Sequence, residues 1–164
     1  MAKVGRVRIV ALGNQDRGDD GAALLVAERF WDVASVVLAG RPGAGLLELL
    51  PPDQGCILLD VTSSGSPPGT LHQLCLGSLN PSSFPDARIS SHGFGPGEAL
   101  ALARSIGRRL PQGYFIGIEG EVYEIGTGLS SAVEEAMTLF EERVREALEW
   151  LKWTATREIT RTLP

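Results

Sequence analysis

The segment from Val7 to Gly21 places the strongest constraint on the fold of this chain. Residues 7–12 (VRIVAL) are mainly β-branched or aliphatic, which is typical of a strand that is buried on both faces. Gly13 and Asn14 end this run, and Asp19-Asp20-Gly21 leads directly into a second apolar stretch, residues 22–27. The segment therefore predicts a buried strand, a polar loop and the start of a helix.

Two adjacent carboxylates at such a junction are unusual, because like charges raise each other's cost of ionisation. One interpretation is that Asp19 caps the following helix, while Asp20 is a solvated acid of the first turn. This interpretation can hold for one member of the pair. It leaves the other available for chemistry.

The rest of the chain alternates expected strands with expected helices. The last helix has the clearest signals, with a capping box at Ser131 and Glu134 and an apolar stripe that reaches Leu151. The other expected strands are 35–38, 56–61, 70–76 and 114–119, and the other expected helices are 21–31, 46–50 and 98–108.

This alternation predicts an α/β fold: a single-domain three-layer sandwich with a mostly parallel, twisted sheet of about five strands and helices on both faces. The domain covers residues 1–152. Residues 153–164 have no clear pattern and form a C-terminal tail that can fray.

Composition excludes several classes of function. A length of 164 residues suits one domain, and a net charge of −5 without a Lys/Arg cluster argues against nucleic acid as a partner. There is no apolar run of membrane-spanning length and no signal-peptide pattern, so we expect no membrane insertion. Cys56 and Cys75 have no metal-binding spacing and are predicted to be small buried hydrophobes in a reduced, cytoplasmic protein.

Three residues are candidates for a functional site: Asp20, Asp60 and His92. Asp20 follows the first strand, Asp60 ends the third, and His92 lies in a loop before a helix. Because ligands of α/β folds bind beyond the carboxyl ends of the strands, the three side chains can meet at one rim. Two carboxylates and an imidazole suit a divalent transition metal, but they also suit metal-free acid–base catalysis, with one Asp activating water and His92 donating a proton. A purely structural role is also open, in which His92 bonds a loop carbonyl and Asp60 caps a turn.

The ordered motifs of the chain resemble those of the hydrogenase maturation endopeptidases, from about Val7 to the last helix. The matching residues are Gly13-Asn14, Gly18-Asp19-Asp20-Gly21, Leu59-Asp60, Ser90-x-His92, Gly117-Ile118-Glu119 and Gly128-Leu129-Ser130. The resemblance implies an endopeptidase that removes the C-terminal extension of a nickel-iron hydrogenase large-subunit precursor after nickel insertion. It places Asp20, Asp60 and His92 on the metal-binding positions. It also implies that nickel is presented by the precursor rather than held permanently, and it leaves open whether a carboxylate or the metal activates water.

Other functions fit the sequence less well. A non-cleaving nickel-binding chaperone or scaffold for hydrogenase assembly stays possible on these residues. Peptidyl-tRNA hydrolases share a Gly-Asn pair after the first strand, but the early acids, the lack of an early histidine and the acidic charge argue against tRNA. The glycine spacing does not match a dinucleotide-binding loop, and the serines near His92 and at Ser63-Ser64 lack a nucleophile elbow.

Overall fold

A five-stranded sheet forms the middle layer of the computed structural model, which describes residues 7–84 and 94–162. The strand order is β2-β1-β3-β5-β4. The strands are β1 (Arg8–Leu12), β2 (Ser35–Gly40), β3 (Cys56–Thr62), β4 (Leu71–Cys75) and β5 (Gly113–Glu119). Neighbouring strands pair in parallel except at β4, which pairs antiparallel with β5 at the edge. The predicted fold class, a mostly parallel α/β sheet, is confirmed.

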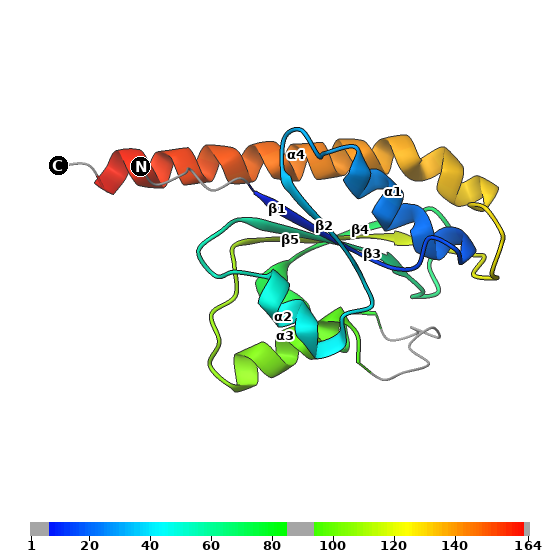
Figure 1. Ribbon diagram of the computed structural model, residues 1–164, viewed down its shortest axis with the longest axis horizontal. Coiled ribbons are helices and arrows are strands. Elements are labelled where there is room, and N and C mark those ends of the chain that lie inside the picture. Colours follow the sequence, from blue (N-terminus) through cyan, green and yellow to red (C-terminus); the bar gives the residue numbers. More distant parts are fainter. Residues whose placement is uncertain (1–6, 85–93, 163–164) are drawn as a thin grey trace.

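Helices cover both faces of this sheet (Figure 1). On one face lie α1 (Ala22–Glu28) and α4 (Ser131–Thr162), and on the other lie α2 (Leu46–Leu49) and α3 (Pro96–Ser105). Short 3-10 turns, η1 (Gly18–Gly21), η2 (Gly43–Gly45) and η3 (Leu76–Ser78), join some of these elements. No helix in the described part of the chain combines the length and apolar character that crossing a bilayer requires.

The alternation of side chains along the buried strands divides the core into two. Ile9, Ile57 and Ile116 pack in the core that includes the helices α1 and α4. Val10 and Leu58, one residue along from Ile9 and Ile57, pack in the second core with side chains of α2 and α3. The strands β1 and β3 are therefore covered on both faces, as their continuous apolar runs predict.

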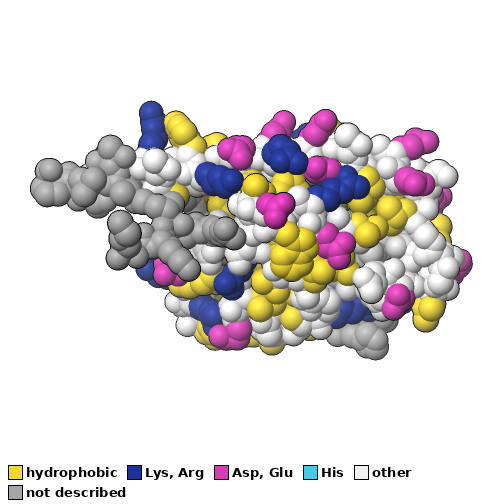
Figure 2. All heavy atoms as spheres, turned by 45° about the horizontal axis from the view of Figure 1, so that its top comes forward, with side chains coloured by type: hydrophobic (Ala, Val, Ile, Leu, Met, Phe, Trp, Pro, Cys, Tyr) yellow, Lys and Arg dark blue, Asp and Glu magenta, His cyan; other side chains and the backbone are white. Residues whose placement is uncertain are grey.

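The outer surface of α4 carries charges of both signs, and Figure 2 shows acidic and basic side chains interspersed on this side of the molecule. Glu141 on α4 pairs with Arg29 from the end of α1 and with Arg145 one turn along the helix. Such exposed pairs contribute little to stability. They mark this surface as solvent-facing.

The start and end of α4 differ from the sequence expectation. The capping contact comes from Ser130 rather than Ser131, because the N–H of Val133 donates to Ser130 Oγ at 3.4 Å. A valine side chain cannot return this contact, so the predicted capping box is not formed. At the other end the helix continues through residues 153–162, where the sequence suggests a tail. The guanidinium of Arg157 stacks over the ring of Trp153 at 4.2 Å, a contact between residues one helical turn apart that supports this extension.

The two cysteines have different surroundings. Cys56 is buried, as predicted, and burial raises the pKa of its thiol to about 12. Cys75 is exposed, so the expectation that it is buried is wrong. It ends the edge strand β4 on the same side as the exposed Gln73, where the alternation of the strand turns side chains to solvent. Both thiols are free.

Candidate functional site at the strand ends

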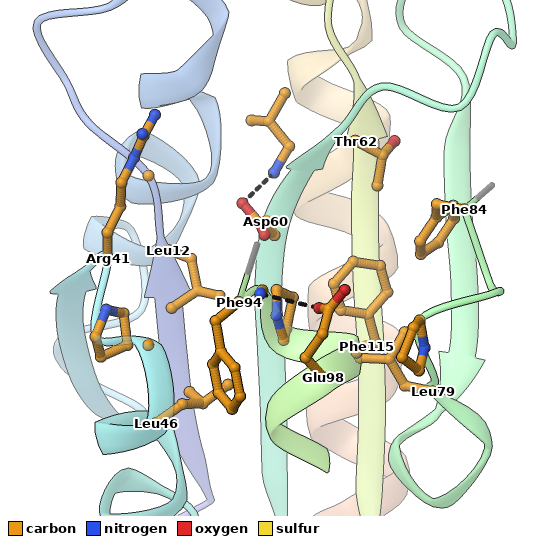
Figure 3. A pocket seen from close by; sticks show the side chains of 18 of the residues that line it. Leu12, Arg41, Leu46, Asp60, Thr62, Leu79, Phe84, Phe94, Glu98 and Phe115 are labelled. Atoms are coloured by element: carbon orange, nitrogen blue, oxygen red, sulfur yellow. Dashed lines mark hydrogen bonds between the residues drawn. The ribbon is translucent and has the colours of Figure 1, made fainter. Parts of the chain in front are cut away.

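A cavity of about 460 Å³ lies beyond the carboxyl ends of β1 and β3. The strand ends supply Leu12 and residues 60–63 to its wall, and the segment 40–43 after β2 supplies another side. Residues 79–81, Phe84 and the start of α3 also contribute to the lining (Figure 3). The cavity is therefore at the rim where the sequence predicts the functional site.

Asp20 reaches this cavity from η1, and its side chain is 9% exposed. Its Oδ2 accepts the N–H of Asn14 at 3.0 Å and Arg41 Nη2 at 2.9 Å. Gly13 makes this arrangement possible, since a Cβ at that position would lie 2.0 Å from the carbonyl oxygen of Asp20. Gly13 also has a φ of 125°, which side chains rarely tolerate.

Asp60 lies near the end of β3 and lines the same cavity. Its Oδ1 accepts the N–H of Val61 at 2.8 Å, which is the hydrogen bond that this carboxylate makes among the described residues. Burial raises the pKa of Asp60 to about 7, and the negative charge of Asp20 adds to this increase. The Val61 N–H and the Arg41 guanidinium oppose it. The side chain can therefore gain and lose a proton near neutral pH.

The third candidate, His92, lies outside the described residues. Within residues 7–84 and 94–162 there is no cluster of three or more His, Cys, Asp and Glu side chains that could hold a metal ion. The structure brings together Asp20 and Asp60, two of the three predicted residues, in one cavity.

Asp19 has a different role from the one predicted for it. The helix α1 begins only at Ala22 with Gly21 as its N-cap, because residues 18–21 form the 3-10 turn η1, so Asp19 does not cap the helix. Its fully buried carboxylate instead accepts the N–H groups of Glu121, Val122 and Ser130 and the hydroxyl of Ser130, at 2.7–2.9 Å. Asp19 thus anchors the loop after β5. Asp20 is not a solvated acid either, since it is buried.

Glu119 is a buried acid whose structural role the sequence reasoning missed. It is 2% exposed and accepts hydrogen bonds from Thr62, Ser64 and Gly65, at 2.6–3.0 Å. His72 Nε2 on β4 lies 3.3 Å from the same carboxylate. Glu119 therefore holds in place the loop that directly follows Asp60. The available signal was an acid at the end of a buried strand.

The cavity has an apolar part beside its carboxylates. In Figure 3, Arg41, Asp60 and Thr62 lie above Leu46, Phe94 and Leu79. Phe84 packs against Phe115, with ring centroids 5.4 Å apart, and both rings also line the cavity. Phe94 is 40% exposed. A cavity that pairs apolar walls with a few polar groups suits a ligand that has both kinds of surface.

Comparison with solved structures identifies proteins of the same architecture. The hydrogenase maturating endopeptidase HybD from E. coli aligns over 88% of this chain and 92% of its own, with 23% identity and a TM-score of 0.74. This chain has the fold of the hydrogenase maturation endopeptidases. A hydrogenase 2 maturation peptidase from a Thaumarchaeota archaeon is 28% identical over 87% of this chain and 97% of its own, with a TM-score of 0.61.

A third similar structure is the [NiFe] hydrogenase maturation protease HybD from Thermococcus kodakarensis, with 21% identity, coverage of 86% and 97%, and a TM-score of 0.60. No family model matches the chain, and no curated protein matches it significantly. The resemblance to hydrogenase maturation endopeptidases that the sequence predicts is confirmed by these structures.

Proposed function

We propose that this chain is an endopeptidase that removes the C-terminal extension of a nickel-iron hydrogenase large-subunit precursor after nickel has been inserted. The observation that carries the proposal is the placement of Asp20 and Asp60 in one cavity at the strand ends. Solved proteins with the same fold are hydrogenase maturation proteases, which supports this substrate.

Nickel enters the proposal as part of the substrate. Asp20, Asp60 and His92 are the residues that would contact it, since carboxylate oxygens and a neutral imidazole suit a borderline divalent cation. The buried carboxylate of Asp20 and the partly buried carboxylate of Asp60 fit this role, because a cation would relieve the repulsion between them. When present, nickel would add Lewis-acid polarisation and would mark the precursor as ready for cleavage.

We assign proton transfer to Asp60. A carboxyl group with a pKa of about 7 is suited to accept the proton of a water molecule as that water attacks the peptide carbonyl. The carboxyl group of Asp60 would then pass this proton to the departing amine, while the neutral imidazole of His92 stays available to the cation. Asp20 is held by the Asn14 N–H and by Arg41, which supports a role in contacting the cation rather than in moving a proton.

The apolar part of the cavity supports a peptide as the ligand. Leu46, Leu79 and Phe115 provide a surface for an apolar side chain close to the carboxylates. A peptide segment offers such a side chain together with a polar backbone. We also propose a cytoplasmic location, which is supported by the two free cysteines.

The test compares nickel-loaded with nickel-free precursor. Each form is incubated with the purified, metal-stripped protein at about pH 7.5, and the intact mass of the large subunit is followed. We expect the nickel-loaded form to be shortened and the nickel-free form to stay intact. Efficient cleavage of the nickel-free form would refute nickel sensing, and binding of the loaded form without any shortening would instead indicate a chaperone or scaffold.

Site variants locate the activity. Asp20→Ala, Asp60→Asn and His92→Ala should each reduce processing by about a hundredfold or more without loss of thermal stability. The exposed Asp32→Asn is a matched control that should process normally. Normal processing by all three site variants would place the active site elsewhere.

A further inference from the structure

Arg41 places a positive charge against Asp20, one of the acids that line the cavity. It follows Gly40 at the end of β2, and its Nη2 donates to Asp20 Oδ2 at 2.9 Å. The Arg41 side chain is 44% exposed, whereas that of Asp20 is 9% exposed. Arg41 is the one Lys or Arg among the described residues that line the cavity.

The charge of Arg41 acts on both carboxylates. Asp20 and Asp60 repel each other, and the Arg41 guanidinium offsets part of that repulsion, as its lowering effect on the pKa of Asp60 indicates. A guanidinium in this position neutralises the same negative charge that would attract a divalent cation. Arg41 and a cation therefore compete for Asp20.

The surroundings allow Arg41 to leave. Within the described residues its guanidinium makes no hydrogen bond other than the one to Asp20, and nearly half of the side chain faces solvent. The Asn14 N–H also donates to Asp20 Oδ2, so the carboxylate keeps a fixed orientation when the guanidinium moves away.

We propose that Arg41 is an internal counter-cation that a metal ion must displace from Asp20, and that it thereby selects against free divalent cations. The inference rests on the proposed function, in which nickel arrives already bound to a precursor. A free ion gains only the few ligands of the pocket, and the displacement of Arg41 weakens its binding. A precursor-held ion is accompanied by the contacts between two protein surfaces, which offset the same displacement.

The test measures binding of Ni²⁺ alone, by calorimetry at about pH 8, where Asp60 is mostly ionised. Arg41→Met replaces the charged side chain by an uncharged, apolar one. The variant protein should bind Ni²⁺ about tenfold more tightly than the unmodified protein. Arg41→Lys keeps the charge and should stay close to the unmodified protein. Arg29→Met, which breaks the ion pair with Glu141 on the outer surface, is the control and should not change the affinity.

A second variant shows where the gain arises. Adding Asp20→Asn to Arg41→Met should abolish the tighter Ni²⁺ binding, because the carboxylate that pairs with Arg41 is then absent. If Arg41→Met does not fold, Arg41→Gln provides the same measurement with an uncharged donor. A merely structural Arg41 would give a weaker or unchanged affinity after its removal.

Unchanged or weaker Ni²⁺ binding by the folded, uncharged variant would overturn the inference, as would an equal gain in Arg41→Lys. These outcomes are independent of the cleavage assay. If the unmodified protein does not shorten a nickel-loaded precursor, the proposed function fails, whatever the calorimetry shows.

Discussion

Buried or partly buried carboxylates occur in two regions of this molecule, and the two regions differ in the number of hydrogen bonds that each carboxylate accepts. In the loop region after β5, Asp19 accepts four hydrogen bonds and Glu119 five from the described residues. In the cavity, Asp20 accepts two hydrogen bonds from the described residues and Asp60 accepts one. We refer to Asp19 and Glu119 as the anchoring carboxylates and to Asp20 and Asp60 as the pocket carboxylates.

The comparison separates a structural role from a functional one. Donors around an anchoring carboxylate stabilise its charge and fix the loops from which they come. A pocket carboxylate retains lone pairs for a ligand and bears part of the desolvation penalty in the absence of that ligand. The anchoring carboxylates should therefore be needed mainly for stability, and the pocket carboxylates mainly for activity.

The largest effect on stability is expected at Glu119. Glu119→Ala leaves the hydroxyl and amide donors of residues 62–65 without their acceptor in a buried site, and should lower the free energy of unfolding by about 3–5 kcal/mol. Urea unfolding measures this loss. The exposed Glu121→Ala in the neighbouring loop is the control and should change stability by less than about 0.5 kcal/mol. Equal losses of stability in Glu119→Ala and Glu121→Ala would show that Glu119 does not anchor its loop.

Substitution of Asp60 should raise the free energy of unfolding at high pH, whereas substitution of Glu119 lowers it. The pKa of Asp60 is raised in the folded protein from 3.8 to about 7, so the carboxyl group contributes stability that is complete below pH 3.8 and is lost as the pH rises through about 7. Asp60→Asn cannot ionise, so the variant should be about 2–4 kcal/mol more stable than the unmodified protein at pH 8. Thermal or urea unfolding at several pH values checks this.

The internal control for Asp60→Asn is the same pair of proteins at about pH 4, where the carboxyl group is already protonated in the folded state. At this pH the two proteins should have nearly the same free energy of unfolding. A difference that stays constant from pH 4 to pH 8 would show that the ionisation of Asp60 has no energetic cost.

Ser130 offers the smallest and most local test of the anchoring role. Ser130→Ala removes one of the four donors to Asp19 together with the hydroxyl that accepts the Val133 N–H at the start of α4, and it leaves the Ser130 N–H in place. A loss of about 1–2 kcal/mol is therefore expected, with normal cleavage activity. Ser131→Ala is the adjacent, exposed control and should be nearly neutral. A larger loss of stability in Ser131→Ala than in Ser130→Ala would instead support the capping box that the sequence predicts.

The part of the fold that the sequence predicts well is the part determined by local pattern. Continuous apolar runs indicate β1 and β3 as strands buried on both faces, because the side chains on both sides of such a strand pack into a core. The antiparallel edge position of β4 is not readable in this way. Its alternation shows only that one face is less buried, which is also why the exposure of Cys75 was missed.

The site could be predicted only in part. Asp20 and Asp60 are placed by their positions at the ends of strands, which the pattern shows. The separate roles of Asp19 and Asp20 depend on partners such as Val122 and Ser130, more than 100 residues away, which no local signal identifies. Arg41 is another such case, since its ion pair with Asp20 joins two loops.

The most direct test of the central claim substitutes two neighbouring residues in the same way. Asp19→Asn and Asp20→Asn each replace a buried carboxylate by an amide of the same shape, and both proteins are examined by urea unfolding and by cleavage of nickel-loaded precursor. Asp19→Asn should lose about 2–4 kcal/mol of stability and still cleave while it is folded, because the amide nitrogen cannot accept the bonds made to Asp19 Oδ1 or Oδ2. Asp20→Asn should remain within about 1 kcal/mol of the unmodified protein and lose cleavage by about a hundredfold or more. A stable, inactive Asp19→Asn together with an unstable, active Asp20→Asn would contradict the account.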